Sequence, residues 1–478
     1  MEYEVIVGLE IHSELKTNSK CFCACKNQFG APINTNVCPV CLGLPGALPT
    51  INKTAFEYAV KAGLAFDSQI TDVAIFERKN YFYPDLPKAY QISQGEKNIC
   101  QGGQIPIVVD GKEKFIRLDN IHLEEDAAKS IHDNLTNTSL IDFNRSGVPL
   151  IEIVTMPDIR SAEEAVATLE QIRQTLIYIG VSDCKMQEGQ LRCDVNISVR
   201  KKGETTYNNR TEMKNLNSFK AVHRAITFES NRQIEVLENG GKIERDTLRW
   251  DDENNCNYFM RSKQSAQDYK YFPDPDMLEV EISKNYVEKI KQNLPVLPSK
   301  RKKYYIEELK LPEYDAKVLT GLKEISDYFE ECLTYYNNPK MVSNWVMGDI
   351  LRMLKEDLLL ENVDIRISAK NFTDLIKMVE NKEISQNASK EVLAEMWLNN
   401  EPCKEIVERL GLKQVNNEDE LIEVVKEIID ANPQAIQDYK NGNAKTLTFF
   451  MGQTMKKTRG KANPQIINKL ILDELKKR

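Results

Sequence analysis

The stretch YEVIVGLEIHSEL, residues 3–15, decides the fold of the N-terminal part of this chain. Its side chains alternate between apolar and polar or small, and this period of two predicts a β-strand with one buried face. The side chains of the predicted buried face are Val5, Val7, Leu9 and Ile11. Glu10 and His12 share the opposite face with Gly8, so a carboxylate and an imidazole lie side by side. Such a pair is suited to binding a metal ion.

The same alternation continues along the chain to about residue 295. It is found in KFIRLDNIHLEED (114–126), SLIDFNRSGVPLIEIV (139–154) and LRCDVNISVR (191–200). Helical patterns are fewer, and the clearest is SAEEAVATLEQIRQTLIYIG (161–180), which begins at the capping residue Ser161. We therefore predict the α+β class, with an antiparallel-sheet-rich domain over residues 1–294.

Beyond that domain the sequence pattern becomes that of charged amphipathic helices. NFTDLIKMVENKEI and SKEVLAEMWLNN have a helical period, and EDELIEVVKEIIDAN repeats it farther on. The expected organisation is an all-α domain over residues 295–408 and a small all-α tail domain over residues 409–478.

Composition limits the class of protein. The chain has 478 residues, 41% of them hydrophobic, and a net charge of -8, so contact with a nucleic acid would need a local basic patch. Apolar runs are too short to span a membrane and an export signal is not evident, which favours a cytosolic protein. Eleven cysteines in such a chain favour free thiols and metal ligands over disulfides.

Three other predicted strands repeat the acidic character of the first. His122 and Glu124 share a face, with Glu125 either pointing away or lying at the strand end. The other two faces carry Arg192, Asp194, Asn196 and Ser198, and Arg210, Glu212 and Lys214. A solvated sheet face would explain any one of them. Four such faces in one domain favour carboxylates gathered for Mg²⁺.

A nucleotide site would have to use metals and basic side chains. Neither GxxxxGK[ST] nor GxGxxG occurs in the sequence. The segment RKNYFYPDLPKAYQISQ, residues 78–94, interleaves Lys79 and Lys88 with aromatic residues, a composition that fits phosphates and stacked bases. An ordinary proline-containing loop with core aromatics explains the segment equally well.

Cysteines crowd two neighbouring segments, SKCFCACKNQFG (19–30) and VCPVCLGLPGALP (37–49). A redox dithiol, a zinc site and a structural turn are the three interpretations. A redox CxxC opens a helix after a strand, which the glycines and prolines after Cys41 disfavour. Four thiolates drawn from the two segments would complete a tetrahedral, structural zinc site, and we favour this interpretation.

Eight ordered segments resemble the B-subunit family of the aspartyl/glutamyl-tRNA amidotransferases, and the likeness runs from end to end. They include VGLEIHSELKTNSKCFCAC, NTNVCPVCLGLPGALP, RKNYFYPDLPKAYQISQ, HLEEDAAKS, NRSGVPLIEIV, MQEGQLRCDVNISVR, EMKNLNSF and DYKYFPDPD. The resemblance implies an ATP-consuming ligase with glutamine as amide donor, which converts Glu-tRNA(Gln) to Gln-tRNA(Gln) or Asp-tRNA(Asn) to Asn-tRNA(Asn). The alternative is a zinc-containing tRNA-binding protein without catalysis.

The resemblance also implies that the domain over residues 1–294 is catalytic and cradle-like in shape, and it implies site residues. The magnesium-binding catalytic set is Glu10, His12, Glu124, Glu125 and Glu212. The zinc ligands are Cys23, Cys25, Cys38 and Cys41, with Cys21 spare. Our own candidates for contacts with ATP and substrate are Lys79, Lys88, Arg192, Asp194 and Lys214.

Partners follow from the same resemblance. The sequence has no GxCxG-like turn for a cysteine nucleophile, so ammonia is expected from an amidase, the A subunit, tied to this chain by a small C subunit in a heterotrimer. Misacylated tRNA would be the macromolecular substrate, and no membrane is expected as a partner. A basic cluster near the C-terminus, bracketed by Gly460 and Pro464 and so expected largely on an exposed turn, would contact tRNA phosphates. Its members are Lys456, Lys457, Arg459 and Lys461. A solvated charged face explains the cluster almost equally well.

Overall fold

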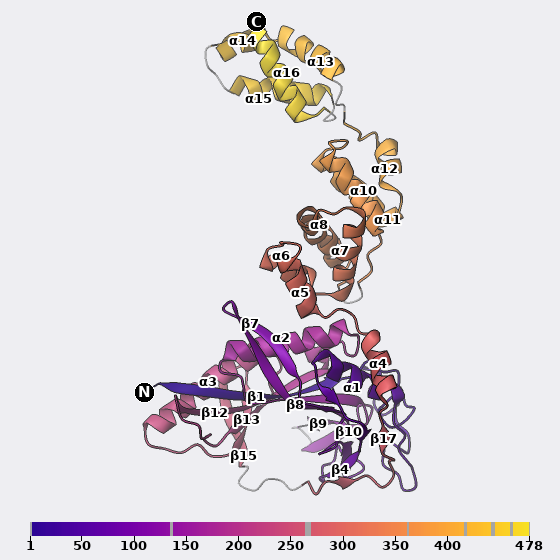
Figure 1. Cartoon of the computed structure of the whole chain (residues 1–478), viewed down its shortest axis with the longest axis vertical. Helices are drawn as coiled ribbons and strands as arrows, with labels where there is room; N and C mark the ends of the chain where they lie inside the picture. Colours follow the sequence, from indigo (N-terminus) through magenta and orange to yellow (C-terminus); the bar gives the residue numbers. More distant parts are fainter. Residues whose placement is uncertain are drawn as a thin grey trace. The chain divides into compact units, whose positions relative to one another are not determined.

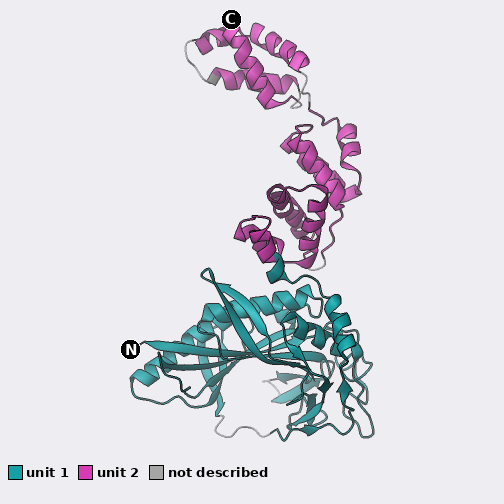
Figure 2. Cartoon of the chain, in the orientation of Figure 1, with its two compact units in different colours: residues 1–301 teal, residues 302–478 magenta. Residues whose placement is uncertain are grey.

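The computed structural model describes residues 2–133, 137–262, 269–360, 363–414, 418–440, 445–458 and 462–477. The chain divides into two compact units, residues 1–301 and residues 302–478 (Figure 2). The sheets lie in the first unit and the second is helical, which confirms the predicted α+β class with helical domains after the sheet. Among the described residues, no helix is both long and apolar enough to cross a membrane.

A large sheet organises the first unit. Counted over the described residues it has ten strands, and the pairing is antiparallel except between β13 and β14. Its strands, in spatial order, are β15 (Cys256–Ser262), β14 (Asp246–Asp251), β13 (Thr211–Lys214), β12 (Leu191–Lys201), β1 (Tyr3–Glu14), β11 (Pro149–Thr155), β8 (Lys112–Glu125), β6 (Cys100–Gln101) and β2 (Gln69–Ile70), with β7 (Gln104–Val109) also on β8.

Small sheets add to this unit on the polar side. Figure 1 shows β4, β9 and β10 on one side of the large sheet and the helices α2 and α3 on the other. Within the described ranges the small sheets number three: β9 (Lys129–Asp133) with β10 (Thr138–Asp142), β16 (Phe272–Pro273) with β4 (Glu77–Asn80) and β5 (Tyr90–Ser93), and β17 (Val280–Glu281) with β3 (Val73–Ala74).

Helices cover the apolar face of the large sheet. Val7, Leu9 and Ile11 are almost fully buried in the core that these helices make with the sheet, as the alternation in β1 predicted. The predicted cap is present, since the Ser161 hydroxyl accepts from the Glu164 N–H at 3.1 Å. The helical elements of this unit are α1 (Lys53–Ala65), α2 (Ala162–Tyr178), the 3₁₀ turn η1 (Met186–Glu188), α3 (Phe219–Glu238) and α4 (Lys284–Gln292), with α5 (Pro298–Glu307) at its boundary.

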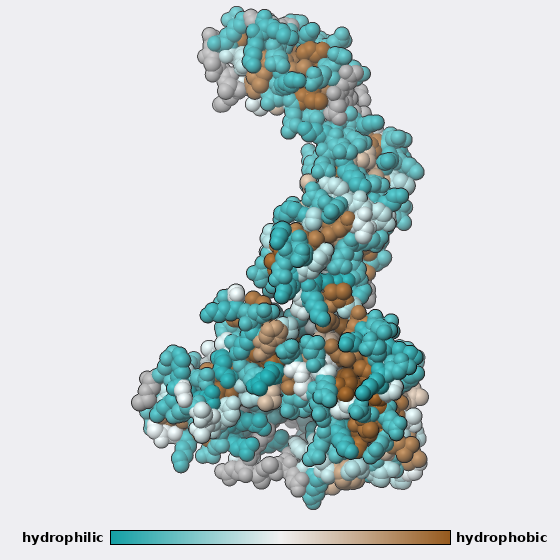
Figure 3. Space-filling model, viewed as in Figure 1, coloured by the Kyte–Doolittle hydropathy of each residue, from teal (hydrophilic) through white to brown (hydrophobic). Residues whose placement is uncertain are grey.

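The second unit contains two hydrophobic cores. One involves residues 305–407 and the other residues 421–475. The face seen in Figure 3 is largely hydrophilic over these helices, as their amphipathic pattern requires. The elements are α6 (Glu313–Leu319), α7 (Lys323–Tyr335), α8 (Pro339–Trp345), the π-helix η2 (Val346–Ile350), α9 (Leu351–Glu356), α10 (Ala369–Glu380), α11 (Gln386–Asn399), α12 (Cys403–Leu410), α13 (Glu418–Asp430), α14 (Pro433–Lys440), α15 (Lys445–Lys457) and α16 (Pro464–Lys477).

Candidate functional site

Strand register gathers ionisable side chains on the sheet face that the helices leave open. His12 on β1 lies opposite Glu152 on β11 and opposite Arg192 on β12. Glu152 in turn lies opposite His122 on β8. Because directly opposed residues in an antiparallel pair project their side chains to the same face, the register alone places two imidazoles around one carboxylate.

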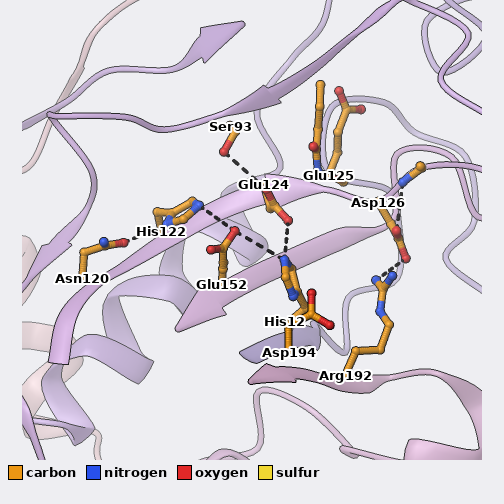
Figure 4. Close-up of polar contacts among 12 residues, drawn as sticks. His12, Ser93, Asn120, His122, Glu124, Glu125, Asp126, Glu152, Arg192 and Asp194 are labelled. Carbon is orange, nitrogen blue, oxygen red and sulfur yellow. Dashed lines mark hydrogen bonds and ion pairs between the residues drawn. The ribbon is translucent and has the colours of Figure 1, made fainter. Parts of the chain in front are cut away.

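The carboxylate–imidazole cluster consists of Glu10, His12, His122, Glu124 and Glu152. Figure 4 labels the last four of these residues. The His12 Nε2 atom lies 3.4 Å from a carboxylate oxygen of Glu124 and 3.4 Å from one of Glu152. The His122 Nε2 atom lies 3.3 Å from the same Glu152 oxygen. Two overlapping triads each have ligand atoms within 4.8 Å of one another. They are Glu10, His12 and Glu152, and His122, Glu124 and Glu152.

The charged groups of the cluster stabilise one another. Burial opposes ionisation of Glu152, but His122 and His12 outweigh it and hold the pKa of Glu152 well below its usual value. Burial likewise opposes protonation of His12, yet Glu152 and Glu124 raise its pKa to about 9. Burial and the nearby Glu152 raise the pKa of Glu10. The donor set of carboxylate oxygens and imidazole nitrogens fits a divalent cation.

Protons and a cation compete for His12, which gives a prediction about pH. We expect the affinity of the cluster for Mg²⁺ or Mn²⁺ to rise between pH 6.5 and pH 9, because His12 must lose its proton to become a ligand. For the cation-free chain the sign is opposite. The stability contributed by protonated His12 is complete below pH 6.5 and is lost as the pH rises through about 9.

Titration calorimetry at both pH values, in buffers of different ionisation enthalpy, measures affinity and proton release together. The variant His12→Gln should lose most of this pH dependence. The control variant His132→Gln should keep it, because His132 bonds Ser139 on the separate β9–β10 hairpin. A cation affinity that does not change with pH would contradict this assignment.

Two predicted cation ligands lie outside the triads. Glu125 points away from His12 in Figure 4 and pairs with Lys88, because successive residues of a strand project to opposite faces. Glu212 accepts from the Thr247 hydroxyl at 3.0 Å and lies 3.4 Å from Lys214. Among the described residues neither belongs to a group of three ligand atoms within 4.8 Å, so their role as ligands stays a prediction.

The predicted basic residues surround the cluster, and most have carboxylate partners. Lys88 pairs with Glu125, and Lys214 pairs with Asp194. Arg192 donates to Asp126 at 2.6 Å.

Lys79 is the predicted basic residue whose charge the cluster itself favours. Burial lowers its pKa, but Glu124 and Glu152 outweigh this and raise the pKa above its usual value. Its ammonium lies 5.3 Å from the centre of the Tyr269 ring. Lys79 therefore brings positive charge to the edge of the cluster.

Glu152 is the central ligand candidate that sequence reasoning missed. It lies in PLIEIVT (149–155), a strand in which nearly every side chain is buried, so the alternation predicted across residues 139–154 does not mark a polar face here. The sequence did offer one signal, because Glu152 is the sole carboxylate of this mostly apolar strand. A buried unpaired carboxylate is costly, and such a residue implies partners supplied by neighbouring strands.

A pocket lies beside the cluster on the same face of the sheet. Its volume is about 530 Å³ and its lining includes Glu10, Asn196, Tyr207, Arg210 and Arg245. Gly8 and Ser198 also line it, as the shared face predicted for β1 and β12 requires. The pocket combines two guanidinium groups, an aromatic ring and one member of the carboxylate–imidazole cluster.

The cysteine segments meet as a second candidate metal centre. The sulfur atoms of Cys23, Cys25, Cys38 and Cys41 all lie within 4.8 Å of one another, whereas Cys21 is buried outside this group. A hydrogen bond from the Cys23 thiol and one from the Cys38 N–H lower the pKa of Cys41 to about 4, although burial opposes this. Four sulfur donors with a stabilised thiolate fit a closed tetrahedral site.

The C-terminal basic cluster is placed in part. Lys456 and Lys457 are exposed in the last turn of α15 and not on the turn after it, which corrects the predicted location. Basic residues are favourable in the last turn of a helix, where both of these lie. Lys457 also pairs with Glu427 of α13. Arg459 and Lys461 lie outside the described residues.

Comparison of the sequence with family models and with named relatives identifies the family of this chain. Residues 5–288 match the family model of the GatB/GatE catalytic domain, and residues 327–475 match that of the GatB domain. Relatives named as B subunits of aspartyl/glutamyl-tRNA(Asn/Gln) amidotransferase are 51% identical in Caldicellulosiruptor saccharolyticus, 49% in Thermoanaerobacter pseudethanolicus and 47% in Persephonella marina. Each alignment covers 100% of both chains. This chain therefore belongs to the family of amidotransferase B subunits.

Proposed function

We propose that this chain activates the side-chain carboxylate of Glu-tRNA(Gln) or Asp-tRNA(Asn) with ATP and then converts it to the amide. B subunits of this family are part of a ligase that uses glutamine as amide donor. A carboxylate resists attack by ammonia until it carries a leaving group. Transfer of the γ-phosphoryl group to a carboxylate oxygen releases ADP, and ammonia then attacks the acyl carbon and displaces phosphate.

The carboxylate–imidazole cluster is the observation that carries this proposal. Glu10, His12, Glu124, Glu152 and His122 would hold Mg²⁺ beside the 530 Å³ pocket. A bound magnesium ion neutralises charge on a transferring phosphoryl group. In the pocket, Arg210 and Arg245 would pair with the phosphates of ATP. Lys79, whose charge Glu124 and Glu152 favour, would contact the substrate.

The alternative is a zinc-containing tRNA-binding protein without catalysis. A surface that only docks a polyanion gains affinity from Lys and Arg and loses it by gathering carboxylates. Two triads of buried or half-buried ligands, three of whose members are glutamates, are therefore evidence for chemistry at this site.

Partner chains and structural zinc complete the proposal. Ammonia would come from the amidase A subunit, with a small C subunit tying the heterotrimer together. Zinc would be held by the four thiolates as scaffolding. Lys456, Lys457, Arg459 and Lys461 would contact tRNA phosphates, adding affinity and salt dependence without selecting the substrate.

The experiment that tests the proposed function uses the heterotrimeric complex with ammonium chloride as nitrogen donor and no glutamine. With ATP, Mg²⁺ and Glu-tRNA(Gln), we expect stoichiometric ADP and Gln-tRNA(Gln) that require this chain. The amidase and the small linking chain together, without this chain, are the control. Tight binding of tRNA without any ADP formation would support the alternative function.

A further inference from the structure

The loop that carries two of the thiols packs directly on Lys88. We call residues 37–47 the cysteine loop. Gly43 in this loop has φ +65°, and a Cβ built there would lie 2.6 Å from Lys88 Cγ and 3.0 Å from Lys88 Cα. Glycine is therefore needed at this position both for the backbone conformation and for the close approach. The cysteine loop and Lys88 fit together with no room for one extra carbon.

Lys88 connects this contact to the carboxylate–imidazole cluster. Its side chain is 9% exposed and pairs with Glu125, which is 3% exposed. The Glu125 carboxylate also accepts from the Ile92 N–H at 3.0 Å. Glu125 directly follows Glu124, whose carboxylate lies 3.4 Å from His12 Nε2. A shift of Lys88 would consequently displace Glu125 and, with it, the neighbouring Glu124 of the cluster.

A second path runs from Cys41 to the same carboxylate. The Ser146 hydroxyl donates to the carbonyl of Cys41 at 3.1 Å. The next residue, Gly147, has φ +84°, and a Cβ there would lie 3.5 Å from Cys41 Cβ and 3.7 Å from a Glu125 carboxylate oxygen. Lys20, which is fully buried, donates to the Cys41 sulfur at 3.6 Å. The thiol centre and Glu125 are thus separated by a single glycine.

We propose that the cysteine loop is a positioning element for the carboxylate–imidazole cluster and acts through Lys88 and Glu125. With Cys38 and Cys41 held to Cys23 and Cys25 by a metal ion, the loop would fix Gly43 against Lys88, and the Lys88–Glu125 pair holds the end of β8. A loop that only stabilised the fold would leave the rate of amidation unaffected by a subtle change in the loop. The proposed function enters only through the kinetic readout described below.

Two glycines of the loop provide a matched pair of variants. Gly43 and Gly46 both have positive φ, +65° and +82°, so alanine strains the backbone similarly at each. Only Gly43 faces Lys88, since nothing lies within 4 Å of a Cβ built on Gly46. Gly43→Ala and Gly46→Ala should therefore retain equal zinc, but only Gly43→Ala adds a carbon against Lys88, so it should unfold at the lower temperature and differ at Lys88.

Acylation of Lys88 by an amine-reactive ester, followed by mass spectrometry, is the first readout and needs no substrate. We expect faster labelling of Lys88 in Gly43→Ala than in Gly46→Ala or the unmodified chain. In the heterotrimeric complex, ammonium-dependent amidation should fall about tenfold to a hundredfold for Gly43→Ala alone, as misplaced catalytic groups usually cause. Because labelling is independent of activity, failure of this inference and failure of the proposed function are distinguishable.

A double-mutant cycle identifies the route. If the loop acts through Lys88, adding Gly43→Ala to Lys88→Ala should lower the rate little further than Lys88→Ala alone. Additive losses, or equal Lys88 labelling in the two glycine variants, would overturn the proposal. Should Gly43→Ala fail to fold, Ser146→Ala removes the bond to Cys41 without backbone strain. That variant must then raise Lys88 labelling, and unchanged labelling would overturn the proposal in the same way.

Discussion

Replacing Glu152 with glutamine is expected to lower ATP-dependent activation by about two to three orders of magnitude, the usual effect of removing one preorganised electrostatic contact. Glu152 is the member shared by both triads, and its carboxylate lies within 3.4 Å of both imidazoles. The amide preserves the shape of the side chain but removes the charge that a divalent cation and the two imidazoles share. Both triads therefore lose a ligand in a single substitution.

Ammonium-dependent formation of ADP and amidated tRNA by the heterotrimeric complex measures the effect. Glu4→Gln is the control on the neighbouring strand β1, because Glu4 pairs with Arg200 and Arg160 outside both triads. Its effect should be small, as for most partly exposed ion pairs. Cation titration separates a lost ligand from a lost fold, since Glu152→Gln should bind Mn²⁺ more weakly while unfolding cooperatively. Full activity of Glu152→Gln would exclude this cluster as the centre.

Period-two alternation made much of the site predictable from the sequence. Glu10 and His12 were placed on one face because the opposite residues of that strand are apolar, and the structure shows this arrangement. Alternation carries no information where both faces are buried, which is why Glu152 was missed in β11. Only the pairing of β11 between β1 and β8 gives that carboxylate its partners.

Glu125 shows a different limit of sequence reasoning. It lies at the last position of β8, where the sequence left open whether it points away or the strand ends. The structure gives it Lys88, 37 residues earlier in the chain, and that contact depends on how the cysteine loop packs. A pairing of this kind is a property of tertiary packing and cannot be read from local pattern.

The thiol centre was easier to predict from the sequence because ligand spacing is a local property. Two cysteines three residues apart and two separated by one residue can each present their sulfurs together, so only the approach of two short segments had to be supplied by the fold. Cys21 lies in the same segment yet is fully buried against the core. The spacing of the motif does not distinguish Cys21 from Cys23. The structure distinguishes them, because Cys21 is buried in the core and Cys23 lies in the cysteine group.

Replacing Cys41 with serine is expected to release about one equivalent of zinc and to lower the free energy of unfolding of the first unit on the order of 5 kcal/mol. That is less than the roughly 10–16 kcal/mol with which structural zinc binds small peptides, because the loop has other anchors. Ser146 holds the Cys41 carbonyl, and the Thr50 N–H donates to Phe22 at 3.0 Å. Serine also leaves the buried Lys20 ammonium without its sulfur acceptor.

Elemental analysis and thermal unfolding of chain purified without chelator test this prediction. Cys21→Ala is the matched control, since Cys21 is a fully buried thiol two residues before Cys23 but outside the cluster. It should keep the metal and lose only the stability of a small buried side chain, about 1 kcal/mol. Retention of zinc by Cys41→Ser would show that three thiolates suffice. Absence of zinc from the unmodified chain would exclude the site, because the four gathered sulfurs would then be explained by hydrogen bonds among thiols, as from Cys23 to Cys41.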